Sequence, residues 1–263
     1  MDFKNKKIWI TGASSGIGEA LSLALANEGA HLILSARNET ELKRVKMNCI
    51  GAKQIDIVLL DIGNHDDIFK IAKETITKVG SIDILINNAG ISQRSLAKDT
   101  DFQVDTHIIN VDLLGTIAIT KAILPTMLAQ KSGHIVTISS LMGKFGAPLR
   151  SGYAAAKHGL HGFFDTLRAE VFDDNIKVLM VCPGFVRTNI SMNAVVADGS
   201  KQGTMDDATN KGLDPSVVAA KIIKAIRREK EEIYLGGREV MGVYMKRFFP
   251  RILSRIVRKA KTT

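Results

Sequence analysis

The stretch Thr11-Gly-Ala-Ser-Ser-Gly-Ile-Gly18 decides the fold of this chain, because it joins an apolar run at residues 7–11 to a segment of helical periodicity. In such a turn Gly12 permits the tight bend, Gly16 lets the backbone approach a pyrophosphate closely, and Gly18 lets the helix pack on the strand. The start of a helix also favours phosphate charge. The stretch therefore predicts a dinucleotide-binding turn. The alternative is an ordinary strand-to-helix turn.

Apolar runs rich in Ile, Val and Leu predict buried strands along the whole chain. They lie at residues 7–11, 31–36, 55–61, 82–87, 134–139 and 176–182, with a weaker run at 232–235. Segments of helical periodicity lie between them, at residues 16–28, 65–78, 105–130, 154–172 and 215–228. This alternation predicts a single-domain α/β fold, a Rossmann-type doubly wound parallel sheet of about seven strands with helices on both faces.

The 263 residues contain no Pro/Ser-rich linker, so we expect one dinucleotide-binding domain over residues 1–237. Its polar, Gly-containing segment 188–213 is expected to form a loop beside the active site. Residues 238–263 form a basic amphipathic extension with eight Lys or Arg and one Glu, which accounts for most of the net charge of +9. The basic character is therefore a property of the C-terminal end.

Composition indicates a cytoplasmic protein. The N-terminus lacks the apolar stretch of a signal peptide, and no apolar run approaches the roughly 20 residues that span a bilayer. Cys49 and Cys182 have neither metal-like nor disulfide-framework spacing, which fits a reducing compartment. His158 and His161 are three residues apart, but no third ligand is evident, so no metal is predicted.

The C-terminal segment 246–261 predicts an amphipathic helix, with Ile252, Leu253, Ile256 and Val257 opposite a basic face. Two alternatives follow: peripheral contact with an anionic membrane, or packing on the protein's own domain or on a neighbouring subunit. Nucleic-acid binding is not expected, because the basic residues lack interleaved aromatic side chains.

The end of the second predicted strand reads Ser35-Ala36-Arg37. A carboxylate there would accept hydrogen bonds from a free ribose 2′-hydroxyl, whereas a guanidinium suits a 2′-phosphate. Arg37, with a hydroxyl contributed by Ser14, therefore favours NADP over NAD. The alternative for Arg37 is a solvated residue at a helix start.

Tyr153 and Lys157 lie four residues apart in a segment of helical periodicity, which puts a phenol and an ammonium on one face. A nearby ammonium favours the phenolate, so the pair predicts an acid/base device. Its value as a signal depends on the dinucleotide turn upstream and on Ser140, thirteen residues before Tyr153.

In these motifs the chain resembles the short-chain dehydrogenase/reductase (SDR) family along nearly its whole length. The matching stretches are Thr11 to Gly18, Asp61, Asn87-Asn-Ala-Gly90, Asn110, Ser140, Tyr153 with Lys157, and Pro183-Gly184. The resemblance implies that Tyr153 exchanges a proton with the substrate oxygen while a hydride moves to or from nicotinamide. It implies that Lys157 assists Tyr153 and binds the nicotinamide ribose, that Ser140 polarises the carbonyl, and that Asn110 holds a water beside Lys157.

The resemblance also implies the cofactor site: Asp61 and Ile62 near adenine, and Pro183, Gly184 and Thr188 near nicotinamide. The full predicted set is Gly12, Ser14, Ser15, Gly16, Ile17, Gly18, Arg37, Asp61, Ile62, Asn88, Ala89, Gly90, Tyr153, Lys157, Pro183, Gly184, Val186 and Thr188.

The expected substrate walls are mainly apolar, without convergent Arg or Lys, and favour a hydrophobic ketone, aldehyde or alcohol over a sugar phosphate or free acid. They are Ser92, Ser140, Leu141, Met142, Phe145, Tyr153, Phe185 and Met192. The resemblance implies a homodimer or homotetramer. The sequence thus predicts an NADP-dependent oxidoreductase, and the alternative is a non-catalytic NADP-sensing or scaffold protein on the same fold.

Overall fold

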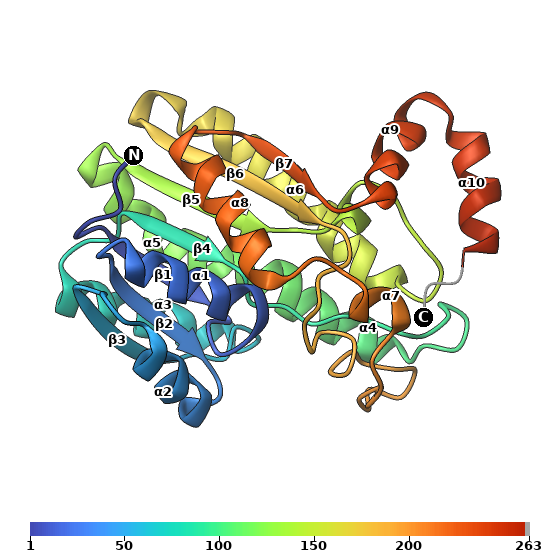
Figure 1. Ribbon diagram of the computed structural model, residues 1–263, viewed down its shortest axis with the longest axis horizontal. Helices are drawn as coiled ribbons and strands as arrows, with labels where there is room; N and C mark the ends of the chain where they lie inside the picture. The colour runs from blue at the N-terminus through green and yellow to red at the C-terminus, as the bar shows by residue number, and fades with distance from the viewer. Residues whose placement is uncertain (261–263) are drawn as a thin grey trace.

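The computed structural model describes residues 1–260, which form a seven-stranded sheet in the order β3-β2-β1-β4-β5-β6-β7 (Figure 1). All neighbouring strands run parallel. The strands are β1 Lys7–Thr11, β2 His31–Ala36, β3 Gln54–Leu59, β4 Ile84–Asn87, β5 Gly133–Ile138, β6 Ile176–Pro183 and β7 Glu232–Leu235. The predicted doubly wound parallel sheet is confirmed.

Helices connect these strands. They are α1 Gly16–Asn27, α2 Glu39–Asn48, α3 His65–Val79, α4 Phe102–Ile109, α5 Thr116–Gln130, α6 Ser151–Glu170, α7 Asp207–Asn210, α8 Pro215–Arg227, α9 Met241–Phe248 and α10 Pro250–Lys259. A π-helix, Asn110–Gly115, links α4 to α5 without a break. Sequence periodicity missed α2 and the short α7, which are both mainly polar.

Two hydrophobic cores cover the two faces of the sheet. Leu21 of α1, Leu42 of α2 and Ile222 of α8 belong to the core that contains Ile8 and Ile10. The other core contains Trp9 together with side chains from α3, α5 and α6. Successive residues of β1 thus enter opposite cores, as the two-residue period of a strand requires.

Trp9 is fully buried and shows how this sequence satisfies its polar groups in the core. Its indole Nε1 donates a 2.9 Å hydrogen bond to Ser35 Oγ on β2.

Close packing requires a glycine where the π-helix meets the turn after β3, because a Cβ on Gly115 would lie 2.1 Å from the Ile62 carbonyl oxygen.

One expectation is corrected here. The continuous helix Phe102–Gln130 is long and apolar enough to cross a bilayer, contrary to the prediction that no segment approaches that length, and half of its most apolar window is buried inside the protein. Asp112 and Lys121 interrupt the apolar run in the sequence, so counting uninterrupted residues missed it. Its buried side forms part of the core with Ile119 and Ile123.

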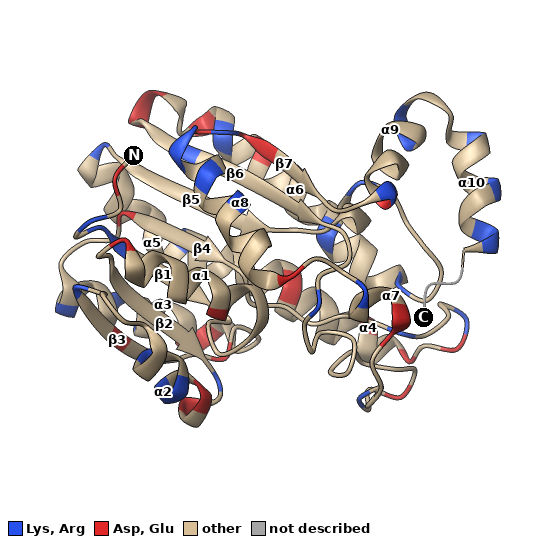
Figure 2. Cartoon of the chain, viewed as in Figure 1, with Lys and Arg blue, Asp and Glu red and all other residues tan. Residues whose placement is uncertain are grey.

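The C-terminal extension forms α9 and α10, which lie together at the right-hand end of the molecule in Figure 1. Blue Lys and Arg positions follow both helices in Figure 2. Leu253 packs inward on Leu141 and Phe145, whereas Ile252 and Ile256 are about half exposed. The extension therefore packs on its own domain with one side and presents apolar and basic residues on the other. Residues 261–263 of the predicted extension lie outside the described residues.

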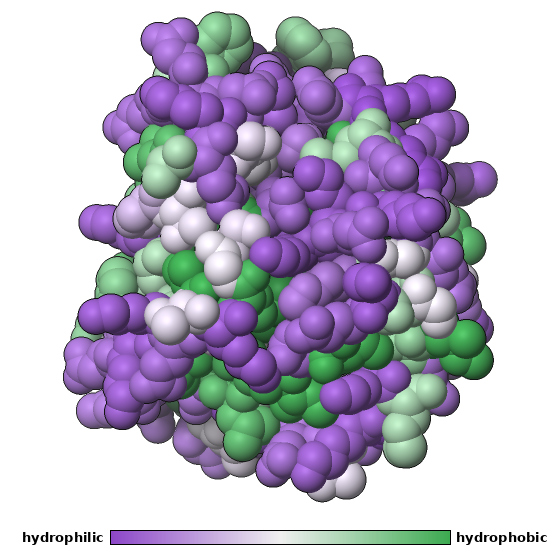
Figure 3. Space-filling model, turned by 90° about the vertical axis from the view of Figure 1, so that its left-hand side faces the viewer, coloured by the Kyte–Doolittle hydropathy of each residue, from purple (hydrophilic) through white to green (hydrophobic). Residues whose placement is uncertain are grey.

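The left-hand side of the molecule, turned to the viewer in Figure 3, presents hydrophilic residues over most of its area. Hydrophobic residues gather in the lower half of that view. This side is remote from α9 and α10, which lie at the opposite end in Figure 1.

Candidate active site

A cleft of about 600 Å³ lies at the carboxyl ends of the strands. Its lining comes from the turns that follow β1, β2, β4, β5 and β6, and from α6. The strand order changes direction between β1 and β4, and in open parallel sheets ligands bind at this switch point. The fold therefore places its binding site where the sequence motifs converge.

The Gly-rich turn is held tightly against the end of β4. Asn88 Nδ2 donates to the carbonyl oxygens of Thr11 (2.9 Å) and Gly12 (3.1 Å). The backbone amides of Asn88 and Ala89 both donate to Thr11 Oγ1 at 3.0 Å. A Cβ on Gly12 would lie 2.8 Å from Ala89 Cα, so only glycine permits this approach. The two motifs are thus one structural unit.

The turn fits a dinucleotide pyrophosphate. Gly12 and Gly16 have φ values of 64° and 59°, which glycine adopts without strain. A Cβ on Gly18 would lie 2.3 Å from the Gly12 carbonyl oxygen, so Gly18 allows α1 to start directly under the turn. Gly16 and Ile17 line the cleft at the start of α1, and the backbone amides of a helix N-terminus suit an anion.

The structure brings nearly the whole predicted cofactor set to the cleft. The lining residues among them are Gly12, Ser14, Ser15, Gly16, Ile17, Arg37, Asp61, Ile62, Asn88, Ala89, Gly90, Tyr153, Lys157, Pro183, Gly184, Val186 and Thr188. Gly18 lies behind the lining and acts by packing.

The end of β2 offers a guanidinium to the cleft. Arg37 is exposed and lines the cleft beside Ser35, Ala36 and Asn38. The nearby Arg44 is instead engaged by Glu19, with a 2.7 Å contact from Nη1 to Oε1. Arg37 is therefore the arginine near this strand end that lines the cleft.

Ser140, Tyr153 and Lys157 all line the cleft and are all buried. Lys157 Nζ lies 5.6 Å from the centre of the Tyr153 ring, as expected for residues one turn apart on α6. Ser140 Oγ accepts a 3.1 Å hydrogen bond from the Met142 amide and lies 3.4 Å from the Pro183 carbonyl oxygen. The structure thus brings the end of β5 and the first turns of α6 to one wall.

The water that Asn110 is expected to hold stays a prediction. Asn110 does not line the cleft, and its carbonyl oxygen lies 2.9 Å from His65 Nε2. Asp112, two residues further on, stands beside Lys157 instead: its Oδ2 lies 3.3 Å from Lys157 Nζ. Both residues belong to the π-helix, whose wider turn shifts the direction of each side chain from that of an α-helix.

Asp112 is fully buried, and burial raises the pKa of its carboxyl group, while the charge of Lys157 and the hydrogen bond from the Ile91 amide act in the opposite direction. Its Oδ1 accepts a 2.8 Å hydrogen bond from the Ile91 amide, while Oδ2 has the ion pair with Lys157 but no hydrogen bond of good geometry. Burial alone lowers the pKa of Lys157, but the Asp112 carboxylate and Tyr153 outweigh it and the pKa is raised. Lys157 is therefore an ammonium at neutral pH.

Most of the predicted substrate walls lie in the cleft: Ser92, Ser140, Leu141, Met142, Phe145, Tyr153 and Phe185. Met192 is a correction, because it is exposed outside the lining, where the neighbouring Ile190 contributes instead. The expectation of no convergent Arg or Lys was also wrong, since Arg94, Arg150 and Lys201 line the cleft. These residues come from separate loops, so no local sequence pattern could have united them.

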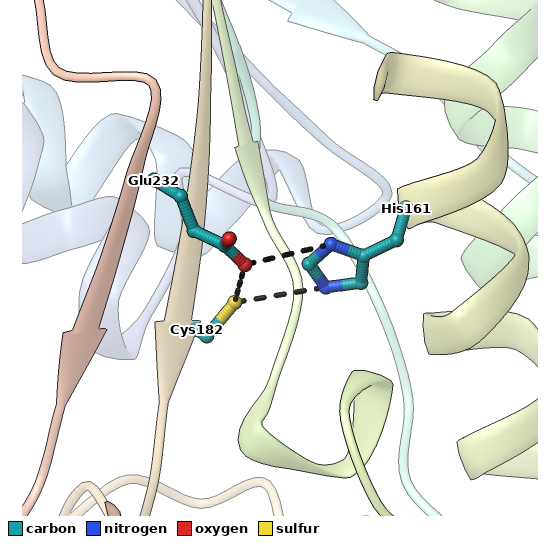
Figure 4. Close-up of side chains that lie close together, drawn as sticks. All are labelled: His161, Cys182 and Glu232. Atoms are coloured by element: carbon teal, nitrogen blue, oxygen red, sulfur yellow. Dashed lines mark hydrogen bonds and ion pairs between the residues drawn. The ribbon is translucent and has the colours of Figure 1, made fainter. Parts of the chain in front are cut away.

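His161, Cys182 and Glu232 form a cluster behind the cleft (Figure 4). The Cys182 sulfur lies 3.6 Å from both His161 Nε2 and Glu232 Oε1. Burial lowers the pKa of His161 to about 4 and raises that of the Cys182 thiol, while Lys144 forms an ion pair with Glu232. At neutral pH the cluster therefore holds a neutral imidazole, a thiol and a compensated carboxylate, which tie α6 to β6 and β7. His158, which was weighed with His161 as a metal ligand, lies outside this cluster: its Nδ1 is 2.8 Å from the Ala154 carbonyl oxygen.

Comparison with known proteins identifies the family to which this chain belongs. A family model described as short chain dehydrogenase matches residues 6–198. The chain belongs to the short-chain dehydrogenase/reductase family. The SDR family member 7B of Mus musculus is 38% identical over 260 residues, covering 97% of this chain and 80% of the relative.

Solved structures of SDR proteins have the same fold as this chain. A short-chain dehydrogenase from Streptomyces avermitilis has a TM-score of 0.84 and 28% identity, covering 99% of this chain and all of that one. An alcohol dehydrogenase from the archaeon Thermococcus sibiricus, complexed with 5-hydroxy-NADP, has a TM-score of 0.77 and 25% identity, covering 89% and 97%. The SDR family consists of oxidoreductases whose fold binds nicotinamide cofactors.

We predict that Asp112→Asn destabilises the protein by about 3 kcal/mol at pH 7, because it leaves a buried ammonium without its carboxylate. Urea unfolding measures the change, and the double variant Asp112→Asn/Lys157→Met should recover part of the loss. Asp174→Asn, which breaks a surface pair with Lys131, is the control and should cost less than about 1 kcal/mol. Equal losses for the two aspartate variants would contradict the assignment.

Proposed function

We propose that this SDR protein is an NADP-dependent oxidoreductase that interconverts a hydrophobic ketone or aldehyde and its alcohol, with Tyr153 as general acid/base. The observation that carries the proposal is the position of Tyr153, Lys157 and Ser140 on one wall of the cleft that also contains the Gly-rich turn. A nucleotide laid across the turn reaches that wall at its far end.

In reduction, Tyr153 donates its hydroxyl proton to the substrate oxygen, and in oxidation it accepts a proton from the alcohol. The Ser140 hydroxyl donates a hydrogen bond to the same oxygen and stabilises the charge that develops there. The bound nicotinamide supplies or accepts the hydride. Lys157 remains an ammonium and would hydrogen-bond the nicotinamide ribose.

Asp112, two residues after Asn110, pairs directly with Lys157. Its carboxylate keeps Lys157 charged in a buried site and fixes where the ammonium points. Asp112 is thus a positioning residue that acts through Lys157.

For the cofactor, the proposal of NADP rests on Arg37. The guanidinium is exposed at the end of β2, where a 2′-phosphate of the adenosine ribose would lie. A phosphate dianion there gains a charge-assisted hydrogen bond that a free hydroxyl does not.

We also propose that the protein is cytoplasmic and that its helices α9 and α10 contact an anionic membrane surface. Phe248, Phe249, Ile252 and Ile256 are exposed, and α10 carries Arg251, Arg255, Arg258 and Lys259. Val257 of the same helix lines the cleft, so a membrane bound here would lie beside the substrate entrance. The homodimer or homotetramer implied by the family resemblance stays a prediction.

Tyr153→Phe is expected to lower kcat for carbonyl reduction at least about 100-fold, because general acid catalysis is lost. Its affinity for NADPH should stay within about twofold. NADPH absorbance with a panel of hydrophobic carbonyl compounds measures turnover, and Tyr244→Phe, an exposed position on α9, is the control. Turnover that survives in Tyr153→Phe would contradict the mechanism. If the wild type binds NADPH but turns over none of the compounds, the sensor or scaffold alternative is favoured.

Arg37→Ala should weaken NADPH binding about tenfold, equivalent to about 1.4 kcal/mol, and leave NADH binding unchanged. Fluorescence titration with both nucleotides checks this, with the exposed Arg228→Ala as control. Equal affinity of the wild type for NADH and NADPH, unaffected by Arg37→Ala, would rule out the NADP assignment.

Full-length protein should float with anionic vesicles and remain unbound with neutral ones. The double variant Ile252→Asp/Ile256→Asp should lose most of that binding, because it places carboxylates on the exposed apolar side of α10. Equal partition of wild type and variant would show that this surface does not contact membranes.

A further inference from the structure

Three side chains of metal-ligand type lie behind the cleft and line none of it. His161 on α6, Cys182 on β6 and Glu232 on β7 point toward one another from three different elements (Figure 4). Each offers one ligand atom, and these atoms all lie within 4.8 Å of one another. The sequence gave no third ligand to His158 and His161, because the other two members of the group come from distant strands.

The hydrogen bonds around His161 leave one ring nitrogen without a partner. Ser139 Oγ lies 3.1 Å from His161 Nε2 and 3.4 Å from the Lys157 carbonyl oxygen. A carbonyl oxygen can only accept, so the Ser139 hydroxyl donates to it and accepts a hydrogen bond from Nε2. His161 is 7% exposed, and its Nδ1 makes no hydrogen bond among residues 1–260. The hydrogen therefore belongs on Nε2, and Nδ1 has a free lone pair.

The atoms that surround this lone pair are electron-rich as well. Glu232 Oε1 lies 3.7 Å from His161 Nδ1, too far for a hydrogen bond. The fully buried Cys182 sulfur lies 3.6 Å from Glu232 Oε1 and 3.6 Å from His161 Nε2. A buried polar atom without a partner is destabilising, so a cluster built only for hydrogen bonding would close the gap at Nδ1. A cation between the three residues would instead satisfy the lone pairs together.

The spacing of the ligand atoms is close to that of tetrahedral zinc. Bonds of about 2.3 Å from zinc to sulfur and about 2.1 Å to nitrogen or oxygen place tetrahedral ligand atoms about 3.4–3.6 Å apart. Glu232 Oε1 lies 3.7 Å from His161 Nδ1 and 3.6 Å from the Cys182 sulfur. The sulfur is also 3.6 Å from the imidazole, at Nε2, so the ring has to turn toward the sulfur to close the sphere.

Lys144 is the cation that competes with a metal for this group. Its Nζ lies 2.5 Å from Glu232 Oε1, and its side chain is 21% exposed. A carboxylate has two oxygens and about four lone-pair sites, so Glu232 can bind a metal through Oε1 and keep Lys144 on Oε2. Burial and Glu232 raise the pKa of Tyr234, which stays a neutral phenol beside the carboxylate. Glu232 is itself 31% exposed on the edge strand β7, which gives the group access to solvent.

We propose that His161 Nδ1, Cys182 Sγ and Glu232 Oε1 form a binding site for Zn²⁺, with a water in the fourth position. Nitrogen, sulfur and oxygen ligands together suit Zn²⁺, whereas Mg²⁺ and Ca²⁺ take oxygen ligands. On binding, a zinc–sulfur bond forms and the thiol proton leaves to solvent, so that sulfur binds as a thiolate. Ser139 orients the metal-bound imidazole through Nε2, as outer partners of histidine ligands do.

This site is structural, because it joins α6 to β6 and β7 and lies outside the cleft. Its test therefore needs no turnover. Full-length protein that has been stripped of metal with a chelator should bind one Zn²⁺ per chain in competition with a chromophoric chelator. Excess Mg²⁺ or Ca²⁺ should not displace it. Cys182→Ser should weaken Zn²⁺ binding at least about 100-fold, because changing even an outer partner of a metal ligand typically costs about 10–100-fold.

Co²⁺ in place of Zn²⁺ reports the sulfur ligand directly. The wild type should show a thiolate-to-cobalt charge-transfer band that Cys182→Ser abolishes. Cys49→Ser is the matched control, because Cys49 is the other buried cysteine, and it should keep both the band and the affinity for Zn²⁺.

Absence of Zn²⁺ binding by the wild type, undiminished binding by Cys182→Ser, or loss of the cobalt band in Cys49→Ser overturns the inference. If Cys182→Ser does not fold, Glu232→Gln replaces it, since Glu232 lies at the partly exposed end of the group. Glu232→Gln should weaken Zn²⁺ binding at least about tenfold. An unchanged affinity in that variant also overturns the site.

Discussion

The buried ion pair of Lys157 with Asp112 is the interaction on which the site depends. Lys157 stands beside Tyr153 as an ammonium, and burial alone would lower the pKa of that ammonium. The Asp112 carboxylate at 3.3 Å prevents this. The pair also joins the π-helix to α6, so that the groups for proton transfer are positioned by the core of the fold rather than by a mobile loop.

The contact between the carboxyl ends of β1 and β4 is the second constraint on the geometry of the cleft. Thr11 and Asn88 hydrogen-bond across the ends of β1 and β4, and this contact holds the Gly-rich turn open toward the cleft. The nucleotide end and the reactive end of the cleft are therefore fixed by the same parallel sheet. Behind the cleft, the His161 cluster joins α6 to β6 through His161 and Cys182, and β6 to β7 through Cys182 and Glu232.

The strands, most helices and the Gly-rich turn could be predicted from the sequence, because each produces a local sequence pattern. Apolar runs and helical periods gave the strands and most helices, and glycines at fixed spacing gave the turn. Side chains placed by tertiary contacts could not be predicted. Asp112 of the π-helix pairs with Lys157 of α6, and Arg94 meets Asp206 across 112 residues of chain. The helix Phe102–Gln130 was missed as an apolar segment because Asp112 and Lys121 interrupt its apolar run.

A crystal structure of the protein with bound NADPH tests the central claim most directly. The account predicts that the pyrophosphate lies against residues 12–18 and that Lys157 Nζ hydrogen-bonds the nicotinamide ribose while it keeps its contact with Asp112. The Tyr153 hydroxyl should face the nicotinamide. A nucleotide bound elsewhere, or a Lys157 that leaves Asp112 and points away from the nucleotide, would contradict the account.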